Sequence, residues 1–287
     1  MDNLLFHGDT VDSNRILYTP SNFAKNSLLH IQEIGTLQAQ RLHESKRTRL
    51  QSFLFFTVNS GSGTLNYCGV KYELAAGDCV FIDCTKPYSH KTSSDLWSLS
   101  WIHLYGPTVP EIYEKYVQRG GLPSFHPVDF AKYKHALNDL YVIATSESYV
   151  RDMKINVGLA NLLTYLMEDS WQAENVRPDA KKSNLLELKN YLDENYAKKI
   201  SLDELAERYY INKYYLTRIF KEQFGASINN YLLSVRITKA KHDLRFTDKS
   251  TEEIGLESGI GNGYYFSRVF HKVEGISPSE YRKQWRS

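Results

Sequence analysis

Short runs of alternating apolar and polar positions fill the first hundred residues of the chain. Between residues 52 and 84, segments rich in β-branched and aromatic side chains are interrupted by Gly, Asn or Asp about every eight to ten residues. This spacing is typical of an antiparallel β-sandwich or small barrel, and we expect strands from about residue 30 to 105. In the stretch WSLSW the period is two, which predicts that Trp97, Leu99 and Trp101 share one face of a strand.

After Pro127 the apolar positions follow a helical period. In the predicted helix at 150–171, one face carries Met153, Val157, Ala160 and Met167, and four leucines widen the apolar surface beyond one stripe. A helix that is apolar on more than one side covers its own domain and a second surface. We therefore predict that this helix contributes to a dimer interface, with burial within the monomer as the alternative.

A polar segment at 172–182 separates this region from the rest of the chain. It contains Pro178 and has no apolar period, so we expect an interdomain linker. The length of 287 residues is more than one small domain usually needs. The pattern therefore predicts one domain at 1–171 and a second, helical domain at 183–287.

The helical domain contains two copies of one pattern, fifty residues apart. Residues 214–227 (YYLTRIFKEQFGAS) match residues 264–277 (YYFSRVFHKVEGIS) at six of fourteen positions. Internal repeats of this kind determine the architecture of a domain. An amphipathic stretch at 231–246 joins the two copies and is predicted to be a helix that holds them at a fixed separation.

Each copy is preceded by a predicted short helix with its own start. Ser201 and Glu204 have the spacing of a capping box, and Ser250 and Glu253 repeat it ahead of the second copy. The order of short helix, tight turn and helix therefore occurs twice. This order is the layout of the helix-turn-helix motif, whose second helix enters the major groove of DNA.

Residues 183–287 resemble the DNA-binding domain of AraC/XylS-type bacterial transcription regulators. The most specific part of the resemblance is FSRVFHKVEGISPSEYR, in which the phenylalanines, Gly-x-Ser-Pro and Tyr-Arg fall at the spacing of the family. Two positions depart from the family pattern. Tyr210 stands where the first turn commonly has Gly, a position that suits a positive φ, and Gly255 stands where the family prefers Ala.

The N-terminal region resembles, more loosely, the cupin-type sensor domain attached to many members of this family. The matching pieces are Gly-Ser-Gly at 61–63, Gly77-Asp78, Pro87 followed by His90, and residues 97–106. The resemblance implies an α+β multidomain protein. Its expected parts are a cupin-like antiparallel β-barrel with a helical dimerisation segment, and an all-α DNA-binding domain with two helix-turn-helix motifs.

The candidates for DNA contact lie near the start of each second helix, at its capping asparagine and at positions expected to be exposed. Arginine can donate two hydrogen bonds to guanine, tyrosine or threonine can pack on a thymine methyl group, and a capping asparagine lies where phosphates bind. The alternative is that both arginines are solvated or salt-bridged surface groups. The predicted DNA-binding residues are Asn212, Lys213, Tyr214, Thr217 and Arg218 in the first unit, and Asn262, Gly263, Tyr264, Ser267 and Arg268 in the second.

The candidates for effector contact lie in the predicted barrel. Tryptophan rings suit the CH-rich faces of sugars and other small organic molecules, and a histidine and an arginine near one mouth would add polar contacts. The alternative for the aromatic face is plain core packing. The predicted ligand-binding residues are Arg41, His90, Trp97, Leu99 and Trp101.

Several classes of protein do not fit the sequence. The histidines show neither a His-x-His pair in the early strands nor a glutamate at the interval of a metal-binding cupin, so we expect no metal and no cofactor. The three cysteines form no Cys-x-x-Cys pair and fit a reducing cytoplasm. No stretch approaches eighteen apolar residues and the start lacks a secretory pattern, so we expect a cytoplasmic protein without a membrane span.

The charge distribution adds weak support for a polyanionic partner. Residues 181–287 hold 19 Lys and Arg against 14 Asp and Glu, whereas residues 1–180 hold 16 against 19. We predict a non-enzymatic regulator that binds double-stranded DNA as a homodimer under the control of a small-molecule effector, with a sugar as the candidate and RNA polymerase as a further candidate partner. The alternatives are a ligand-independent regulator whose barrel only dimerises, and a cupin enzyme with a DNA-targeting tail.

Overall fold

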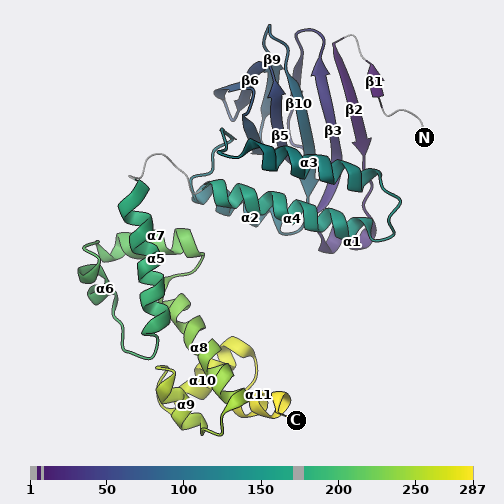
Figure 1. The fold of residues 1–287 in the computed structure, drawn as a ribbon. Helices are drawn as coiled ribbons and strands as arrows, with labels where there is room; N and C mark the ends of the chain where they lie inside the picture. The colour runs from purple at the N-terminus through teal and green to yellow at the C-terminus, as the bar shows by residue number, and fades with distance from the viewer. Residues whose placement is uncertain (1–4, 8–9, 171–177, 287) are drawn as a thin grey trace. The chain divides into compact units, whose positions relative to one another are not determined.

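The computed structural model describes residues 5–7, 10–170 and 178–286, and the chain divides into two compact units, 1–173 and 174–287 (Figure 1). The N-terminal unit combines strands with helices. Its helices are α1 (Asn22–Ser27), α2 (Val109–Gln118), α3 (Phe130–Thr145) and α4 (Arg151–Asp169). Its strands are β1 (Leu5–His7), β2 (Val11–Leu17), β3 (His30–Ala39), β4 (Glu44–Arg47), β5 (Phe53–Ser60), β6 (Ser62–Tyr67), β7 (Val70–Ala75), β8 (Cys79–Asp83), β9 (Tyr88–Thr92), β10 (Ser98–Tyr105) and β11 (Ser124–Phe125).

The strands form two antiparallel sheets. The larger sheet has the order β1-β2-β3-β10-β5-β8-β11, and the smaller has the order β4-β9-β6-β7. The chain passes between the sheets at Gly61, whose φ of 70° suits glycine and whose added Cβ would lie 2.7 Å from the carbonyl oxygen of Leu96. No ladder between described strands joins the two sheets, so the structure shows a two-sheet β-domain rather than the closed barrel that we expected.

The larger sheet is buried on both of its faces. Along β10, Leu99 and Trp101 lie in the core shared with the smaller sheet, as does the adjacent Trp97. Ile102 and Leu104 lie in a second core, which contains the buried residues of α3 and α4. The predicted common environment of the two tryptophans and Leu99 is thus confirmed. One face of the sheet is available to build a pocket, while the other is covered by helices (Figure 1).

Helix α4 is apolar on two sides, as its sequence indicates. The leucine side is buried within its own unit, and Leu163 and Leu166 are at most 3% exposed. The other side carries Met153 and Val157, which are 48% and 57% exposed. The leucines therefore belong to the core of the unit, and the second stripe remains open to solvent.

The C-terminal unit is helical throughout its described part. Residues 172–177 of the predicted linker lie outside the described residues. Its last five residues, 178–182, form the start of the first helix of this unit. Pro178 is tolerated there because the first helical turn needs no backbone N–H donor. The helices are α5 (Pro178–Glu194), α6 (Leu202–Arg208), α7 (Lys213–Phe224), α8 (Ile228–Phe246), α9 (Thr251–Glu257), α10 (Gly263–Glu274) and α11 (Pro278–Trp285).

Capping boxes start several of these helices. Ser201 Oγ accepts a hydrogen bond from the Glu204 N–H and the Glu204 carboxylate accepts one from the Ser201 N–H, and the pair that begins at Ser250 does the same. Both boxes were predicted from the sequence. A third box, formed by Ser277 and Glu280 at the start of α11, was not. Each box satisfies N–H groups that would otherwise have no intrahelical partner.

Helix α8 connects the two helix-turn-helix units. At its start, Tyr231 packs edge-on against Phe220 of α7, with ring centroids 5.5 Å apart, and donates a hydrogen bond of 2.6 Å to Asp193 of α5. Further along, Ile237 and Leu244 are buried in the core of the second unit. The helix thus belongs to both cores, as expected of a rigid connection between them.

Candidate nucleic-acid interface and effector pocket

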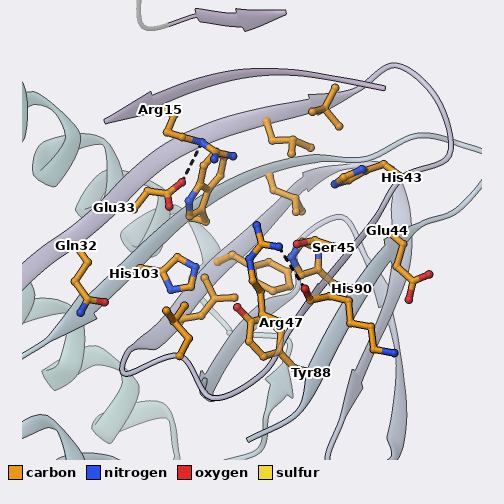
Figure 2. A pocket seen from close by; sticks show the side chains of 18 of the residues that line it. Arg15, Gln32, Glu33, His43, Glu44, Ser45, Arg47, Tyr88, His90 and His103 are labelled. Atoms are coloured by element: carbon orange, nitrogen blue, oxygen red, sulfur yellow. Dashed lines mark hydrogen bonds and ion pairs between the residues drawn. The ribbon is translucent and has the colours of Figure 1, made fainter. Parts of the chain in front are cut away.

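A cavity of about 940 Å³ opens on the inner faces of the two sheets (Figure 2). Strands β2, β3, β5 and β10 of the larger sheet line it on one side, and β4 and β9 of the smaller sheet line it on the other. Leu99 and Trp101 form part of its apolar wall. Cavities of about 300–1,000 Å³ with apolar walls and a few polar groups are typical of small-molecule sites.

Oppositely charged side chains from two paired strands meet on the wall of this pocket. Arg15 Nε on β2 lies 3.0 Å from Glu33 Oε1 on β3, and the Arg15 guanidinium lies 5.4 Å from the ring centroid of Trp101. Gly35 leaves room for the Trp101 ring, because an added Cβ would lie 2.9 Å from it. The close packing of β2, β3 and β10 therefore places a cation over the indole ring.

The histidines of the pocket are neutral near pH 7. Burial and the neighbouring positively charged and imidazole side chains lower the pKa of His90 to about 3. Burial and the charge of Arg47 lower the pKa of His103 to about 4. Ser52 Oγ lies 3.0 Å from His103 Nδ1. In the described part of the chain, no group of three or more His, Cys, Asp or Glu side chains is arranged to hold a metal ion.

In the first helix-turn-helix unit, the N-terminal end of α7 is polar and exposed, and apolar residues of the same helix are buried in the core. Asn212 caps the helix, and its Oδ1 accepts hydrogen bonds from the N–H groups of Tyr214 and Tyr215 at 3.0 and 3.3 Å. Leu216 and Phe220 are buried in the core of the unit. Tyr214 is 76% exposed, so the start of the helix extends an aromatic side chain into solvent.

The predicted DNA-contacting side chains of α7 have local partners in the free protein. Lys213 Nζ donates to Asp203 Oδ1 at 2.8 Å, and Thr217 Oγ1 donates to the Lys213 carbonyl at 2.9 Å. Arg218 Nε lies 3.7 Å from Glu222 Oε1. Exposed ion pairs of this kind contribute about 0–1 kcal/mol, so exchanging a carboxylate for a phosphate or a base costs little.

The second unit repeats this arrangement with one difference. Asn262 caps α10 by accepting from the Tyr265 N–H at 3.0 Å, and Tyr264 and Arg268 are exposed, with 5.9 Å between the guanidinium and the Tyr264 ring centroid. The expectation that Gly263 is exposed is wrong. Its N–H donates to Glu252 Oε2 at 3.0 Å, and an added Cβ would lie 2.5 Å from that oxygen, because α9 packs directly against this position.

Comparison with known proteins identifies relatives of this domain. A family model described as a helix-turn-helix domain matches residues 205–284. The lactose operon transcription activator of Staphylococcus xylosus is 26% identical over 241 residues, which cover 82% of this chain and 85% of that protein. The transcriptional activator RhaS of Klebsiella pneumoniae is 32% identical over 122 residues, which cover 42% of this chain and 43% of that protein.

The chain belongs to the AraC family of helix-turn-helix transcription regulators. A solved AraC-type regulator from Chromobacterium violaceum is also similar, with 30% identity over 36% of this chain and 92% of that one at a TM-score of 0.34. The family model and the curated relatives thus make this AraC-family protein a DNA-binding transcription regulator. None of its described helices is both long enough and apolar enough to cross a membrane.

The two departures from the AraC-family pattern have structural explanations. Tyr210 adopts a φ of 52°, and the corresponding residue of the second turn, Gly259, adopts 73°. The expectation of positive φ at Tyr210 is thus confirmed. Gly255 has no room for a side chain, because an added Cβ would lie 2.6 Å from the Gly261 carbonyl and 2.8 Å from Phe266 Cβ.

The pocket of this AraC-family regulator includes three of the five predicted ligand-binding residues. His90, Leu99 and Trp101 line it. Trp97 does not, because its side chain is fully buried behind the wall, next to His90. Arg41 is exposed and is not among the lining residues.

Sequence reasoning missed the charged residues of the pocket. Arg15 and Glu33 meet through the pairing of β2 with β3, and we expected no strand before residue 30. Arg47 reaches the cavity from β4, which pairs with β9 in the smaller sheet. Alternation along β4 places Ser45 and Arg47 on one face, and the sequence alone can predict this. The sequence does not predict which strand lies opposite that face.

Proposed function

We propose that this AraC-family regulator is controlled by a small carbohydrate bound in the pocket between the two sheets. The observation that carries the proposal is a cavity of about 940 Å³ whose wall contains Trp101 together with several hydrogen-bonding side chains. An indole ring beside polar groups suits the CH-rich face and the hydroxyl groups of a sugar. The relative from Staphylococcus xylosus is a lactose operon transcription activator, which agrees with this class of effector.

We further propose that the N-terminal unit is a variant of the cupin-type sensor in which the two sheets face each other without closing. The sensor would comprise residues 1–171, and the DNA-binding domain would comprise residues 183–287 together with the rest of α5. Leu185, Leu188 and Leu192 of α5 are buried. A fragment from residue 174 onward keeps the whole helix and is therefore the better candidate for independent folding.

We propose that α7 and α10 are the reading helices on double-stranded DNA. Their exposed starts carry the pairs Tyr214 and Arg218, and Tyr264 and Arg268. If α8 holds both units on one side of the duplex, they enter successive major grooves roughly 34 Å, or about ten base pairs, apart. A footprint of one subunit should then span about two helical turns.

We also propose a homodimer that uses the exposed stripe of α4. Leu163 and Leu166 are core residues, so the informative substitution lies on the stripe, at Val157. Val157→Glu should convert a particle of twice the chain mass into a monomer in analytical ultracentrifugation. Val142→Glu on α3, at a side chain with the same exposure of about 58%, is the matched control. A dimer that survives Val157→Glu would refute this interface.

The carbohydrate proposal is tested by thermal unfolding of the full chain with lactose, galactose, glucose and maltose. A bound ligand at 100 times its Kd stabilises the folded protein by about 2.7 kcal/mol and raises its Tm. Trp101→Leu should abolish the shift, and Arg41→Gln, outside the pocket, should preserve it. If no sugar, neutral or charged, shifts the Tm or changes DNA affinity, the carbohydrate proposal is refuted, and the alternative of a ligand-independent regulator whose sensor unit only dimerises gains support.

A further inference from the structure

The charges on the pocket wall do not cancel. Arg15 and Glu33 neutralise each other at 3.0 Å. On β4, alternation separates Glu44 from Arg47, and Figure 2 shows Glu44 directed away from the cavity while Arg47 extends into it. Glu44 and Lys46, which also border the cavity, carry opposite charges and alternate with Arg47 along β4, so the lining as a whole has one excess positive charge.

Arg47 has no carboxylate partner in the described part of the chain. Its Nη1 donates to the Lys46 carbonyl at 3.3 Å, which leaves most of its five N–H donors available. In Figure 2 its guanidinium lies between His103 and His90, in the open part of the pocket. Both imidazoles are neutral near pH 7, so they neither add to the positive charge nor neutralise it.

We propose that the effector carries an anionic group, a carboxylate or a phosphate, that binds the guanidinium of Arg47. The inference rests on the proposed carbohydrate function, and it narrows that class to acidic sugars. Guanidinium and carboxylate or phosphate groups form paired N–H···O bonds that are stronger than those to neutral hydroxyl groups. The sugar ring then lies toward Trp101, and the neutral histidines provide hydrogen bonds to its remaining oxygens.

A cationic effector fits the pocket less well. The inward carboxylate that could receive an ammonium group is Glu33, and Arg15 already occupies it. An amino sugar would have to displace Arg15 from Glu33 and would also approach the positive charge of Arg47. The same geometry predicts that removing the Glu33 charge frees Arg15 and gives the pocket a second cation for an anion.

Isothermal titration of the full-length protein tests the charge of the effector directly. The probes are glucose, glucuronate, glucose 6-phosphate and glucosamine, together with the corresponding galactose series. We expect the acid or the phosphate to bind at least tenfold more tightly than the neutral sugar of the same series, and the comparison of the two identifies the anionic group. High salt should weaken this preference, because a partly exposed charge pair is screened.

Three variants connect the preference to the residues. Arg47→Gln should reduce the affinity for the acidic sugar to that of the neutral sugar, and Arg41→Gln should leave the preference unchanged. Glu33→Gln should strengthen acid binding several-fold. Circular dichroism of each variant confirms that the fold is intact, so that the Glu33→Gln gain and the Arg47→Gln loss cannot both come from misfolding.

The outcomes separate the inference from the function beneath it. A neutral or amino sugar that binds as tightly as the acid, or a preference that survives Arg47→Gln, overturns the inference while the carbohydrate function stands. Binding of benzoate and citrate through Arg47 without binding of any sugar overturns the carbohydrate function and retains the anionic site. Failure of every probe to bind counts against both.

Discussion

The two helix-turn-helix units have the same order of helices, but their turns differ in backbone conformation and length. The first turn uses Tyr210 at a φ of 52° and has one residue, Ile211, before its capping asparagine. The second turn uses Gly259 and contains one more residue, Gly261, before its own asparagine. The short helix of the second unit also packs closer to its partner, because Gly255 and Gly263 have no side chains. The second unit is therefore fixed by close packing, and the first tolerates strain in an exposed turn.

The comparison teaches that sequence identity between repeats does not imply equal tolerance to substitution. The identical positions of the repeat, such as Phe220 and Phe270, perform the same packing in both units. The positions that differ determine how close the helices come. Substitutions at matched positions of the two units should therefore have the same effect in the cores and opposite effects in the turns.

The largest effect is expected from the core aromatic residues. Phe220→Ala and Phe270→Ala should each lower the free energy of unfolding of a 174–287 fragment by about 3–5 kcal/mol, because both side chains are fully buried. Since α8 belongs to both cores, each variant should still unfold in one transition in urea. Two separate transitions would show that the units fold independently and would break the proposed coupling through α8.

The next largest effect is expected at the arginines on the reading helices of the two units. Arg218→Ala and Arg268→Ala should each weaken specific binding by about 1–3 kcal/mol if they read bases, with the loss concentrated at one base pair of each half of the site. Lys221→Ala, at the far end of α7, is the control. Binding titrations on specific and random DNA distinguish the roles, because a phosphate contact weakens both DNAs alike and lowers the salt slope by about one.

The parts that the sequence predicted well are those determined by short spacings. Capping boxes and asparagine caps involve residues within a few positions of each other, so the spacing itself carries the geometry. The repeat of α7 in α10 was found by matching two short segments directly. The pocket is different, because Arg15 and Glu33 meet through the pairing of β2 with β3, and Arg47 reaches the same cavity from β4 in the other sheet. Gly263 was misplaced for a related reason. A glycine has no side chain to show which way its position faces, and the glutamate that buries it lies eleven residues earlier.

Substitutions at the corresponding positions of the two short helices, beside the turns, should have a smaller effect on the free energy of unfolding. Gly255→Ala should destabilise the 174–287 fragment by about 1–3 kcal/mol, because the new methyl group would overlap the Gly261 carbonyl and Phe266. The corresponding residue of the first unit is already Ala206, and Ala206→Gly should cost about 1 kcal/mol through lost helix propensity. Urea unfolding measures both. A stabilising Gly255→Ala would show that α9 and α10 can separate without cost, contrary to the close packing inferred here.

The smallest effect is expected at the strained turn itself. There the test is whether the substitution raises or lowers the free energy of unfolding. Tyr210 is 96% exposed, so its ring contributes little packing, whereas a left-handed backbone costs a non-glycine residue about 1–2 kcal/mol. Glycine removes that cost but increases the entropy lost on folding, which leaves a net gain of about 0.5–1 kcal/mol for Tyr210→Gly. Gly259→Ala should have the opposite effect, because its Cβ would also lie 2.6 Å from the Ala197 carbonyl.

Tyr210→Ala separates the backbone contribution from that of the ring, since it removes the ring but keeps the Cβ. If the gain of Tyr210→Gly comes from the backbone, Tyr210→Ala leaves the unfolding midpoint in urea close to that of the parent fragment. Equal gains from the two variants would mean that the ring, and not the dihedral angle, destabilises the parent. In that case the difference between the two turns would lie in what Tyr210 contacts, and an exposed tyrosine beside a reading helix would become a candidate contact for DNA or for RNA polymerase.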